Sequence, residues 1–453
     1  MVIIMIYDTI VAKTTANGTS AINLIRVSGS DSFEIVQNIF TGKILKNQRT
    51  HSIHYGFIKD GNNVIDEVLV SVLKAPKTFT TEDIVEIACH GGNLIANEII
   101  KLVIAHGARL AENGEFSKRA YLNGRLDLTE AESIMDLVNA KTTTQLKIAN
   151  SQLRGDILKL VGELQNDVLD IVANIEVNID YPEYDDVVEL TNEIIIPNIK
   201  LLINKIDRIL KESSTGQIIR EGIKTVIVGK PNVGKSSLLN ILLKEDKAIV
   251  TEISGTTRDL IEAELNLEGI ILKLIDTAGI RITDDIVEKI GISKTRKAIS
   301  EADLILLVLD QSTVLTEMDI ELLEITKAKQ RIIIGNKSDL GSKISLANEH
   351  ILNISVKNNV GIDKLSEEVK RLFIDEKLLS GDYTVISNSR HIGKLKETKI
   401  ALEQALQSAG EQIPIDMVEI DLRKAWSCLG EITGENSNDD LISTLFSKFC
   451  LGK

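Results

Sequence analysis

The stretch GKPNVGKS, residues 229–236, decides the fold of the central part of the chain. It matches the pattern G-x-x-x-x-G-K-[ST], follows an apolar run at Thr225–Val228 and precedes the helix-like run SSLLNILL. In this context the backbone amides of the loop surround phosphate groups, Lys235 reaches the β and γ oxygens, and Ser236 coordinates magnesium. The sequence therefore predicts a phosphate-binding loop between a strand and a helix.

The segment around this loop, from about residue 218 to 378, alternates short apolar runs with helical patterns. The runs are KTVIVG, ILKLID, DLILLVLD, RIIIGNKSD and ILNIS. Such alternation is typical of a doubly wound α/β sheet, in which each strand is followed by a helix that covers one face.

Two further motifs lie at the ends of predicted strands in this segment. Asp276 and Gly279 of DTAG stand where a magnesium-side carboxylate and a γ-phosphate amide belong, and Thr257 of GTTRD is the natural second magnesium hydroxyl. In NKSD, Asp339 can accept both N–H groups of guanine, which adenine does not offer. The order of these elements predicts a guanine-nucleotide site rather than a glycine turn with surface acids. Its predicted residues are Asn232, Val233, Gly234, Lys235, Ser236, Ser237, Thr251, Glu252, Ile253, Ser254, Gly255, Thr256, Thr257, Asp276, Thr277, Ala278, Gly279, Asn336, Lys337, Asp339, Ser355, Val356 and Lys357.

Ile280 follows DTAG, where many GTP-hydrolysing proteins carry a Gln that orients the attacking water. Its side chain neither donates nor accepts a hydrogen bond, so another group must take that role. Asn232 and the oxygen-rich segment Thr251–Thr257 could hold a monovalent cation beside the phosphates. Acids that could orient water follow at Asp284, Asp285 and Glu288. Their chemistry alone favours a solvated face.

The flanking segments have a different composition. Residues 1–118 mix β-rich runs, such as Ile22–Val27 and Ile84–Ala88, with a helical stretch near Leu94–Val103, which predicts an α+β domain. From 119 the pattern is helical, with a capping box expected at Thr129 and Glu132. Apolar residues then recur at helical spacing from 153 to 175, YPEYDD at 181–186 ends that helix, and the next one is expected to end near 213–216.

The pattern after residue 380 is again helical. We therefore predict a multidomain α/β protein with an α+β domain over residues 1–118, a discontinuous helical domain over 119–217 and 380–453, and an inserted Ras-like domain with a phosphate-binding loop over 218–379.

The composition excludes several classes of protein. The formal net charge of −14 and an aromatic content of 3% argue against sequence-independent binding of nucleic acid through phosphates or base stacking. Three scattered cysteines do not form a disulfide framework or a zinc site. The opening run VIIMIY is too short for a membrane span and lacks the features of a signal peptide, so we expect a soluble cytoplasmic protein.

Four stretches carry a resemblance to a known family. They are DTIVA…IRVSG, APKTFTTEDIVEIACHGG, GEFSKRAYLNGRLDLTEAE and the ending LGEITGENSNDDLISTLFSKFCLGK. With the nucleotide motifs, the chain resembles the MnmE (TrmE) family of tRNA-modifying GTPases over its whole length. The resemblance implies a folate-binding N-terminal domain, a helical domain and an inserted GTPase domain that dimerises to hydrolyse GTP.

The same resemblance implies an activity and partners. Members of the family are homodimers that work with the flavoprotein MnmG, in a heterotetramer. Together they add an aminomethyl or carboxymethylaminomethyl group to C5 of the wobble uridine of certain tRNAs. Tetrahydrofolate, in its 5,10-methylene or 5-formyl form, supplies the one-carbon unit, and ammonium or glycine supplies the nitrogen.

The resemblance also assigns roles to residues. By motif position, potassium would be held by Asn232, Thr251, the carbonyl of Ile253 and Thr256, magnesium by Ser236 and Thr257, and water would be positioned indirectly by Glu288. Folate would contact Arg26, Glu86, Arg125 and Lys453, which without the family would be interpreted as surface charges. Two departures from the family concern folate: the loop Asn17–Asn23 lacks the usual glycines, and Arg125 stands where Lys is frequent.

The remaining polar candidates have more than one interpretation. Cys450 does not fit a prenylation box, because the last residue is Lys and no basic run precedes it; a thiol acting as nucleophile or acid and a small packed residue remain open. Cys89 and Cys428 are expected in the core, and His90 is expected to make local hydrogen bonds rather than bind metal.

The sequence bears on two rival functions. A ribosome-assembly GTPase would share the nucleotide motifs, but no GxxG loop of a KH module follows them. A folate enzyme with a regulatory GTPase domain and a substrate other than tRNA also remains open, because no residue visibly reads uridine.

Overall fold

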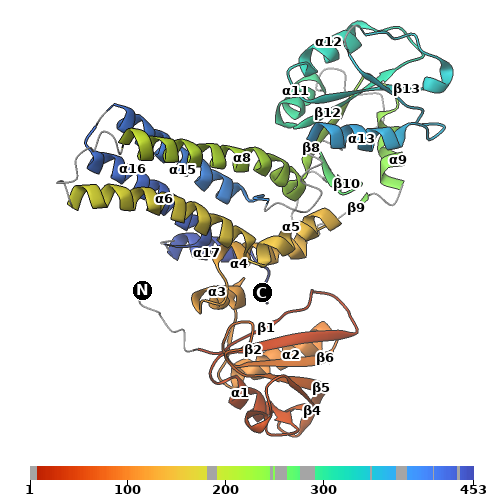
Figure 1. Ribbon diagram of the computed structural model, residues 1–453. Helices are drawn as coiled ribbons and strands as arrows, with labels where there is room; N and C mark the ends of the chain where they lie inside the picture. Colours follow the sequence, from red (N-terminus) through yellow and green to blue (C-terminus); the bar gives the residue numbers. More distant parts are fainter. Residues whose placement is uncertain are drawn as a thin grey trace. The chain divides into compact units, whose positions relative to one another are not determined.

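The computed structural model describes residues 8–180, 191–244, 248–249, 263–275, 291–346, 349–373, 385–411, 413–435 and 439–452. The chain divides into two compact units (Figure 1). Unit 1 comprises residues 1–135, 152–165 and 426–453, and unit 2 comprises 136–151 and 166–425. The domain boundaries at 118, 217 and 379 remain predictions.

Unit 1 contains a sheet with the strand order β3-β4-β5-β6-β2-β1-β7. Neighbouring strands are antiparallel except β1 and β7, which are parallel. The strands are β1 (Ile10–Lys13), β2 (Ile22–Ser28), β3 (Phe40–Thr41), β4 (Ser52–Asp60), β5 (Asn63–Leu73), β6 (Ile84–His90) and β7 (Arg109–Leu110). The α+β character expected for this part of the chain is confirmed.

One face of this sheet is covered by the helices α1 (Ser32–Ile39) and α2 (Asn93–Ala105). Because side chains alternate across a strand, Val68, Val70 and Val72 of β5 are buried against these helices. Leu69, between them, is exposed on the other face.

Arg119, on the short helix α3 (Glu115–Leu122), is the centre of a buried ionic network in unit 1. Only 2% of the residue is exposed, and its guanidinium contacts Glu115 (3.0 Å), Asp8 (2.7 Å) and Glu82 (3.1 Å). Arg109 also donates to Glu115, at 2.8 Å. Burial by itself raises the pKa of Glu115, but Arg109 and then Arg119 hold this pKa below its ordinary value.

The capping box of α4 (Leu128–Asn139) lies two residues earlier than predicted. Asp127 accepts a hydrogen bond from the Glu130 amide (2.8 Å), and Glu130 accepts one from the Asp127 amide (2.9 Å). Thr129 is buried inside the helix and donates to Asp127 instead. The prediction was wrong because Asp127, like Thr, is a strong N-cap and precedes a Glu by three residues. Helix α17 (Asp439–Ser447) packs against α4 through Leu128, Ala131, Ile442 and Phe446.

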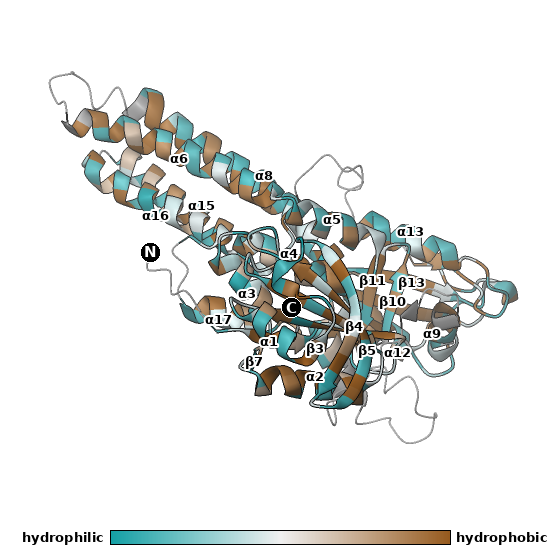
Figure 2. Ribbon diagram, turned by 90° about the horizontal axis from the view of Figure 1, so that it is seen from below, coloured by the Kyte–Doolittle hydropathy of each residue, from teal (hydrophilic) through white to brown (hydrophobic). Residues whose placement is uncertain are grey.

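The helices that follow also differ in detail from the sequence pattern. Gly155, with φ +83°, separates α5 (Thr143–Leu153) from α6 (Asp156–Asp180), so Leu153 is not part of the long helix. The residues 181–186 lie outside the described residues. Figure 2 shows that α6 carries both hydrophobic and hydrophilic residues, as its apolar spacing predicts.

Helix α8 (Ile196–Glu221), which follows the π-helical turn Thr191–Ile195, continues past the predicted end at 213–216. A Cβ at Gly216 would lie 2.3 Å from Cγ1 of Val385, so this glycine permits close packing rather than ending the helix. The last long helices are α15 (Ser389–Gly410), which packs against α8, and α16 (Ile415–Thr433).

The sheet of unit 2 has the strand order β14-β13-β12-β8-β11-β10-β9. The first five strands in this order are parallel, and β10 is antiparallel to both of its neighbours. The strands are β8 (Ile223–Val228), β9 (Ala248–Ile249), β10 (Ala263–Leu267), β11 (Ile270–Leu274), β12 (Leu304–Asp310), β13 (Arg331–Asn336) and β14 (Ile351–Asn353). The five apolar runs of the sequence are thus parallel strands, as predicted.

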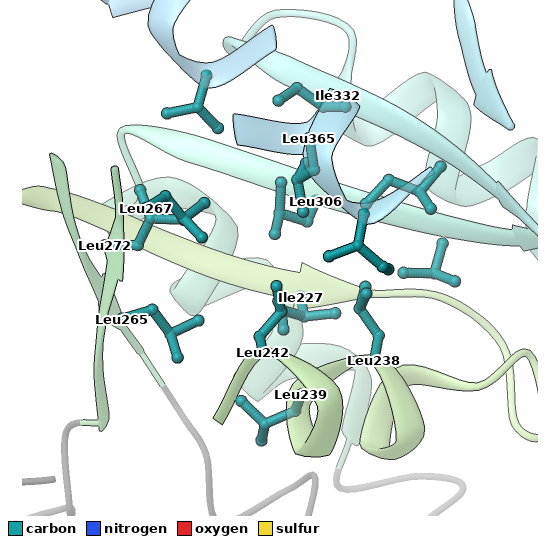
Figure 3. Close-up of a cluster of buried hydrophobic side chains, with 14 of the residues drawn as sticks. Ile227, Leu238, Leu239, Leu242, Leu265, Leu267, Leu272, Leu306, Ile332 and Leu365 are labelled. Atoms are coloured by element: carbon teal, nitrogen blue, oxygen red, sulfur yellow. The ribbon is translucent and has the colours of Figure 1, made fainter. Parts of the chain in front are cut away.

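Helices cover both faces of this sheet. Ile223 and Ile227 of β8 pack with α9 and α13 in the cluster of Figure 3, whereas Val226 and Val228 face the cluster with α11 and α12. The helices are α9 (Lys235–Lys244), α11 (Gly291–Glu301), α12 (Glu317–Thr326) and α13 (Ile362–Phe373). Within the described part of the chain, none of the helices has the length and apolar character of a membrane span.

Candidate functional site

The predicted phosphate loop connects β8 to α9, at the carboxyl end of a central parallel strand. Asn232 has φ +64°, a conformation that few residues other than glycine adopt. The Lys235 ammonium donates to the carbonyls of Gly229 (2.7 Å) and Lys230 (2.8 Å), so the loop wraps around this charge. The arrangement is that of a turn built to face an anion.

A cavity of about 540 Å³ opens beside the loop and contains most of the described nucleotide residues. Asn336 connects the cavity walls, because its amide nitrogen donates to the Val233 carbonyl (2.7 Å) and its oxygen accepts from the Val356 amide (3.1 Å). A Cβ at Gly234 would lie 2.3 Å from the Asn336 amide nitrogen, so only glycine fits there. The lining residues are Asn232, Gly234, Ser237, Asn240, Ile241, Asn336, Lys337, Asp339, Leu340, Val356 and Lys357.

Asp339 belongs to the short 3-10 helix Ser338–Leu340 at the end of β13. The Ser355 hydroxyl donates to one of its carboxylate oxygens at 2.6 Å and itself accepts from the Asn358 amide at 3.3 Å. Ser355, after β14, thereby orients the carboxylate at the cavity wall. A fixed carboxylate at this place accepts paired N–H donors, such as those of guanine.

Lys337, the residue before this turn, has φ +62° and donates to the Asp310 carboxylate at 2.6 Å. Asp310 ends β12 and is 7% exposed, and Ser312 donates to its other oxygen. Burial alone raises the pKa of Asp310, but Lys337 and Ser312 hold this pKa below its ordinary value. The sequence interpretation missed Asp310, although its place at the carboxyl end of a central strand was a usable signal.

A second ion pair that the sequence interpretation missed connects the phosphate loop to a helix. Lys230, a variable position of the loop motif, donates to Asp319 at 2.8 Å. Asp319 is 1% exposed and forms the capping box of α12 with Thr316. The pKa of Asp319 would be raised by burial, but Lys230 and Thr316 keep it low. Lys230 therefore fixes the loop to a helix that follows another strand.

Part of the predicted site lies outside the described residues. This applies to Thr251, Glu252, Ile253, Ser254, Gly255, Thr256, Thr257, Asp276, Thr277, Ala278, Gly279, Ile280, Glu288 and Lys453. Of the predicted metal ligands, Asn232 and Ser236 are described, and both are exposed on or beside the loop.

In unit 1 the structure brings three of the four predicted folate residues together. Arg26 of β2 and Glu86 of β6 are directly opposite in the sheet, and their side chains form an ion pair at 2.8 Å. The guanidinium of Arg26 lies 5.1 Å from the centroid of the Phe79 ring, and that of Arg125 lies 4.9 Å from it. Phe79, which the sequence interpretation missed, thus joins the three charged residues.

The C-terminal tail, residues 450–453, is described to Gly452 and contacts the segments around Gly114 and Lys13. The Gly114 amide donates to the Cys450 carbonyl at 3.4 Å, and Leu451 pairs with Asn113. A Cβ at Gly452 would lie 2.4 Å from the carbonyl oxygen of Lys13, at the end of β1. Because β1 pairs with β2 next to Arg26, the tail leads toward the predicted folate residues.

The three cysteines and His90 differ in their burial and contacts. Cys450 is exposed, which disfavours its interpretation as a packed residue, whereas Cys89 and Cys428 are buried as predicted. Burial, with the nearby Asp66 carboxylate, raises the pKa of Cys89 to about 11, so its thiol is unreactive. His90 contacts Asp66 at 2.7 Å. Because Asp66 lies on the neighbouring strand β5, this hydrogen bond is not the local one that was expected.

Comparisons with known proteins identify relatives of this chain. The family model described as the GTP-binding protein TrmE N-terminus matches residues 9–125, and that of the MnmE helical domain matches 128–450. The chain is 49% identical to the tRNA modification GTPase MnmE of Bacillus cytotoxicus over 99% of its length and 100% of that protein. It is 48% identical to the protein of the same name from Enterococcus faecalis, over 99% of each chain.

Among solved structures, the G domain of the T. maritima FeoB iron transporter is similar at 28% identity, with a TM-score of 0.25, over 33% of this chain and 97% of that one. Era from Aquifex aeolicus, bound to GDP and AlF4⁻, is 25% identical with a TM-score of 0.25, over 40% of this chain and 66% of that one.

Proposed function

This chain belongs to the MnmE (TrmE) family, and we propose that it is a potassium-stimulated GTPase that modifies the wobble uridine of certain tRNAs together with a flavoprotein of the MnmG type. The GTPase and tRNA-modification parts follow the names of full-length relatives at 49% identity. The activity belongs in the cytoplasm, with tRNA as the macromolecular substrate.

The observation that carries the proposal is the cavity at Asp339. Its carboxylate is oriented by Ser355, and Asn336 connects the phosphate loop to the segment after β14. A base held there would present its Watson–Crick edge to a carboxylate, which favours guanine over adenine. Lys235 and the loop amides would then face the phosphates, with Ser236 and Thr257 as magnesium ligands.

Hydrolysis needs a substitute for the missing Gln, and we assign this role to a cation and an acid. Asn232, Thr251, the Ile253 carbonyl and Thr256 offer the hard oxygen donors that suit potassium. Bound potassium would supply the positive charge that an arginine finger provides elsewhere. Asn232 is held at positive φ on the cavity wall, which supports a specialised role. Glu288 would orient the attacking water through a second water molecule.

The rate of GTP hydrolysis tests this assignment. At equal ionic strength, replacing potassium by sodium should lower the initial rate at least about tenfold, because the site loses a developing-charge stabiliser. The Glu288→Gln variant should be about 10²-fold slower in potassium with an unchanged affinity for GTP. Asp284→Asn is the matched control and should keep the rate. Equal rates in the two salts would contradict the potassium assignment.

The cluster around Phe79 supports the folate part of the proposal. The Glu86 carboxylate, held by Arg26, can accept the paired N–H donors of a pterin ring, and Arg125, which lies against Phe79, can pair with a carboxylate of the glutamate moiety. The tail leads to β1, whose Ala12 is the direct neighbour of Arg26 in the sheet. Tetrahydrofolate in its 5,10-methylene or 5-formyl form is therefore the proposed one-carbon donor.

Removal of residues 450–453 should weaken the binding of 5-formyltetrahydrofolate about tenfold or more, because a cation and one wall of the site are lost. Calorimetric titration of the intact and shortened chains measures this effect. The chain with Lys448→Gln, an exposed charge next to the tail, is the control and should bind as the intact chain does. Equal affinities of the intact and shortened chains would exclude the tail from the site.

An exposed apolar surface on unit 1 supports the proposed homodimer. Ile53, Tyr55 and Leu69, on neighbouring strands, are 66%, 59% and 48% exposed on the sheet face opposite α1 and α2. A second copy of this face would remove these side chains from water. Sedimentation should therefore show a dimer for the intact chain and a monomer for Tyr55→Glu. A monomeric intact chain would contradict the proposal that this surface forms a homodimer interface.

The charge of the chain bears on how tRNA is bound. With a net charge of −14, the chain attracts phosphates weakly, so we propose that the flavoprotein partner contributes most of the affinity for tRNA within a heterotetramer. GTP hydrolysis would drive G-domain dimerisation and conformational change rather than the carbon chemistry.

A further inference from the structure

Unit 1 has a cleft of about 640 Å³ whose backbone is strained at two places. Among the described residues, positive φ occurs outside glycine at His51, Thr81, Asn232, Glu268, Lys337 and Asn359. Asn232 and Lys337 line the nucleotide cavity, and His51 (φ +59°) and Thr81 (φ +63°) line this cleft. Positive φ is unfavourable for a β-branched residue such as Thr81, and backbone strain of this kind concentrates at binding sites.

The charges on the cleft wall have one sign. Lys77 and Arg125 carry positive charges there, and His51 adds an imidazole. No Asp or Glu is found among the described residues that line the cleft. In a chain with a net charge of −14, a cleft whose charged side chains are all basic favours a ligand with several negative charges.

The cleft is continuous with the cluster proposed to bind folate. Phe79 and Arg125 belong to its lining, and Arg125 is fixed there because its guanidinium donates to the Phe79 carbonyl at 2.7 Å. Arg26, paired with Glu86, lies against the same Phe79 ring. A ligand that begins at the Arg26–Glu86 pair therefore reaches the cleft by passing Phe79, whose ring can contact an aromatic group.

We propose that this cleft binds the γ-linked polyglutamate chain of tetrahydrofolate, with Lys77 as a specificity-determining residue for its carboxylates. The inference rests on the proposed folate function and extends it from the folate headgroup to the length of its tail. Each added glutamyl residue carries one carboxylate, which can pair with a basic side chain of the wall such as Lys77. The volume of the cleft is in the range of small-molecule sites.

The test compares two ligands on the intact chain, 5-formyltetrahydrofolate with one glutamate and with five. We expect the pentaglutamate to bind about tenfold more tightly than the monoglutamate at low salt. In Lys77→Gln this preference should fall to about threefold or less, while the monoglutamate affinity stays within about twofold. Lys43→Gln removes an exposed charge of unit 1 that does not line the cleft, and it should keep the full preference.

The outcomes separate the inference from the function on which it rests. Equal affinities for the two folates would overturn the polyglutamate site but leave the folate proposal intact. If the preference for the pentaglutamate survives Lys77→Gln unchanged, the polyglutamate chain binds elsewhere. Failure of a folded chain to bind either folate would overturn the folate proposal and this inference together. Salt-dependent tRNA binding lost in Lys77→Gln, without any preference between folates, would assign the cleft to RNA phosphates and contradict the inference.

Discussion

Replacement of Asp339 by Asn is expected to lower the affinity for GTP by about 10⁴-fold, the size of effect seen when a site loses its hydrogen-bond match to a base. The carboxylate is held by Ser355 at 2.6 Å and lines the nucleotide cavity. An amide there would present N–H donors to the N–H donors of guanine, which leaves polar groups unpaired in the complex. Equilibrium binding of a fluorescent GTP analogue measures the loss.

The same variant should gain affinity for xanthosine triphosphate, because the 2-oxo group of xanthine accepts the hydrogen bond that Asn donates. This gain distinguishes a changed specificity from misfolding. Asp363→Asn, an exposed Asp at the start of α13 and outside the cavity, is the matched control and should bind GTP as before. GTP affinity within tenfold of the unmodified chain would show that Asp339 does not read the base.

Replacement of Arg119 by Met is expected to lower the free energy of unfolding of unit 1 by about 3–5 kcal/mol. The side chain is 1% exposed and contacts Asp8, Glu82 and Glu115. Its removal leaves these carboxylates without their shared counter-charge, which is more costly than the loss of one surface ion pair. Trp426, the single tryptophan of the chain, lies in unit 1, so its fluorescence during a urea titration reports this transition.

Arg49→Met, an exposed arginine of the same unit, is the control and should change the unfolding free energy by less than about 0.5 kcal/mol. If Arg119→Met also changed the unfolding free energy by less than about 0.5 kcal/mol, the ionic network would not stabilise unit 1.

The network also predicts a dependence on pH. Burial by itself raises the pKa values of Glu115 and Asp8, but Arg109 and Arg119 lower them by more than burial raises them. Both pKa values therefore lie below their ordinary values in the folded chain. A lowered folded pKa contributes stability above the unfolded pKa, about 4, and this stability is lost as the pH falls through the folded pKa. The unfolding free energy should therefore decrease below about pH 4, and less steeply in Arg119→Met. A pH-independent unfolding free energy between pH 5 and 3 would contradict this expectation.

The parts of the site that the sequence predicted are those that depend on local chain geometry. A glycine-rich loop between a strand and a helix, and polar residues directly after parallel strands, must meet at one edge of a sheet. Asn336 and Asp339 could therefore be expected near the loop without coordinates, and they hydrogen-bond with Val233 and Ser355. Their role in binding a nucleotide stays a prediction.

The parts that the sequence did not predict depend on contacts between distant segments. Phe79 joins Arg26 to Arg125 only because three separate segments meet there, and nothing in its local sequence distinguishes it from a core residue. Asp310 fixes Lys337 from another strand. Gly216 looked like a helix end but is a contact point for Val385, since tertiary packing outweighs helix propensity.

Nucleoside analysis of tRNA by mass spectrometry measures directly whether GTP hydrolysis here serves tRNA modification. The intact chain is incubated with the proposed flavoprotein partner, tRNA, methylenetetrahydrofolate, glycine or ammonium, and GTP, in potassium or in sodium. We predict a carboxymethylaminomethyl or aminomethyl group on C5 of the wobble uridine in potassium, little product in sodium, and none with Asp339→Asn. Potassium-stimulated GTP hydrolysis without any modified uridine would contradict the proposed function.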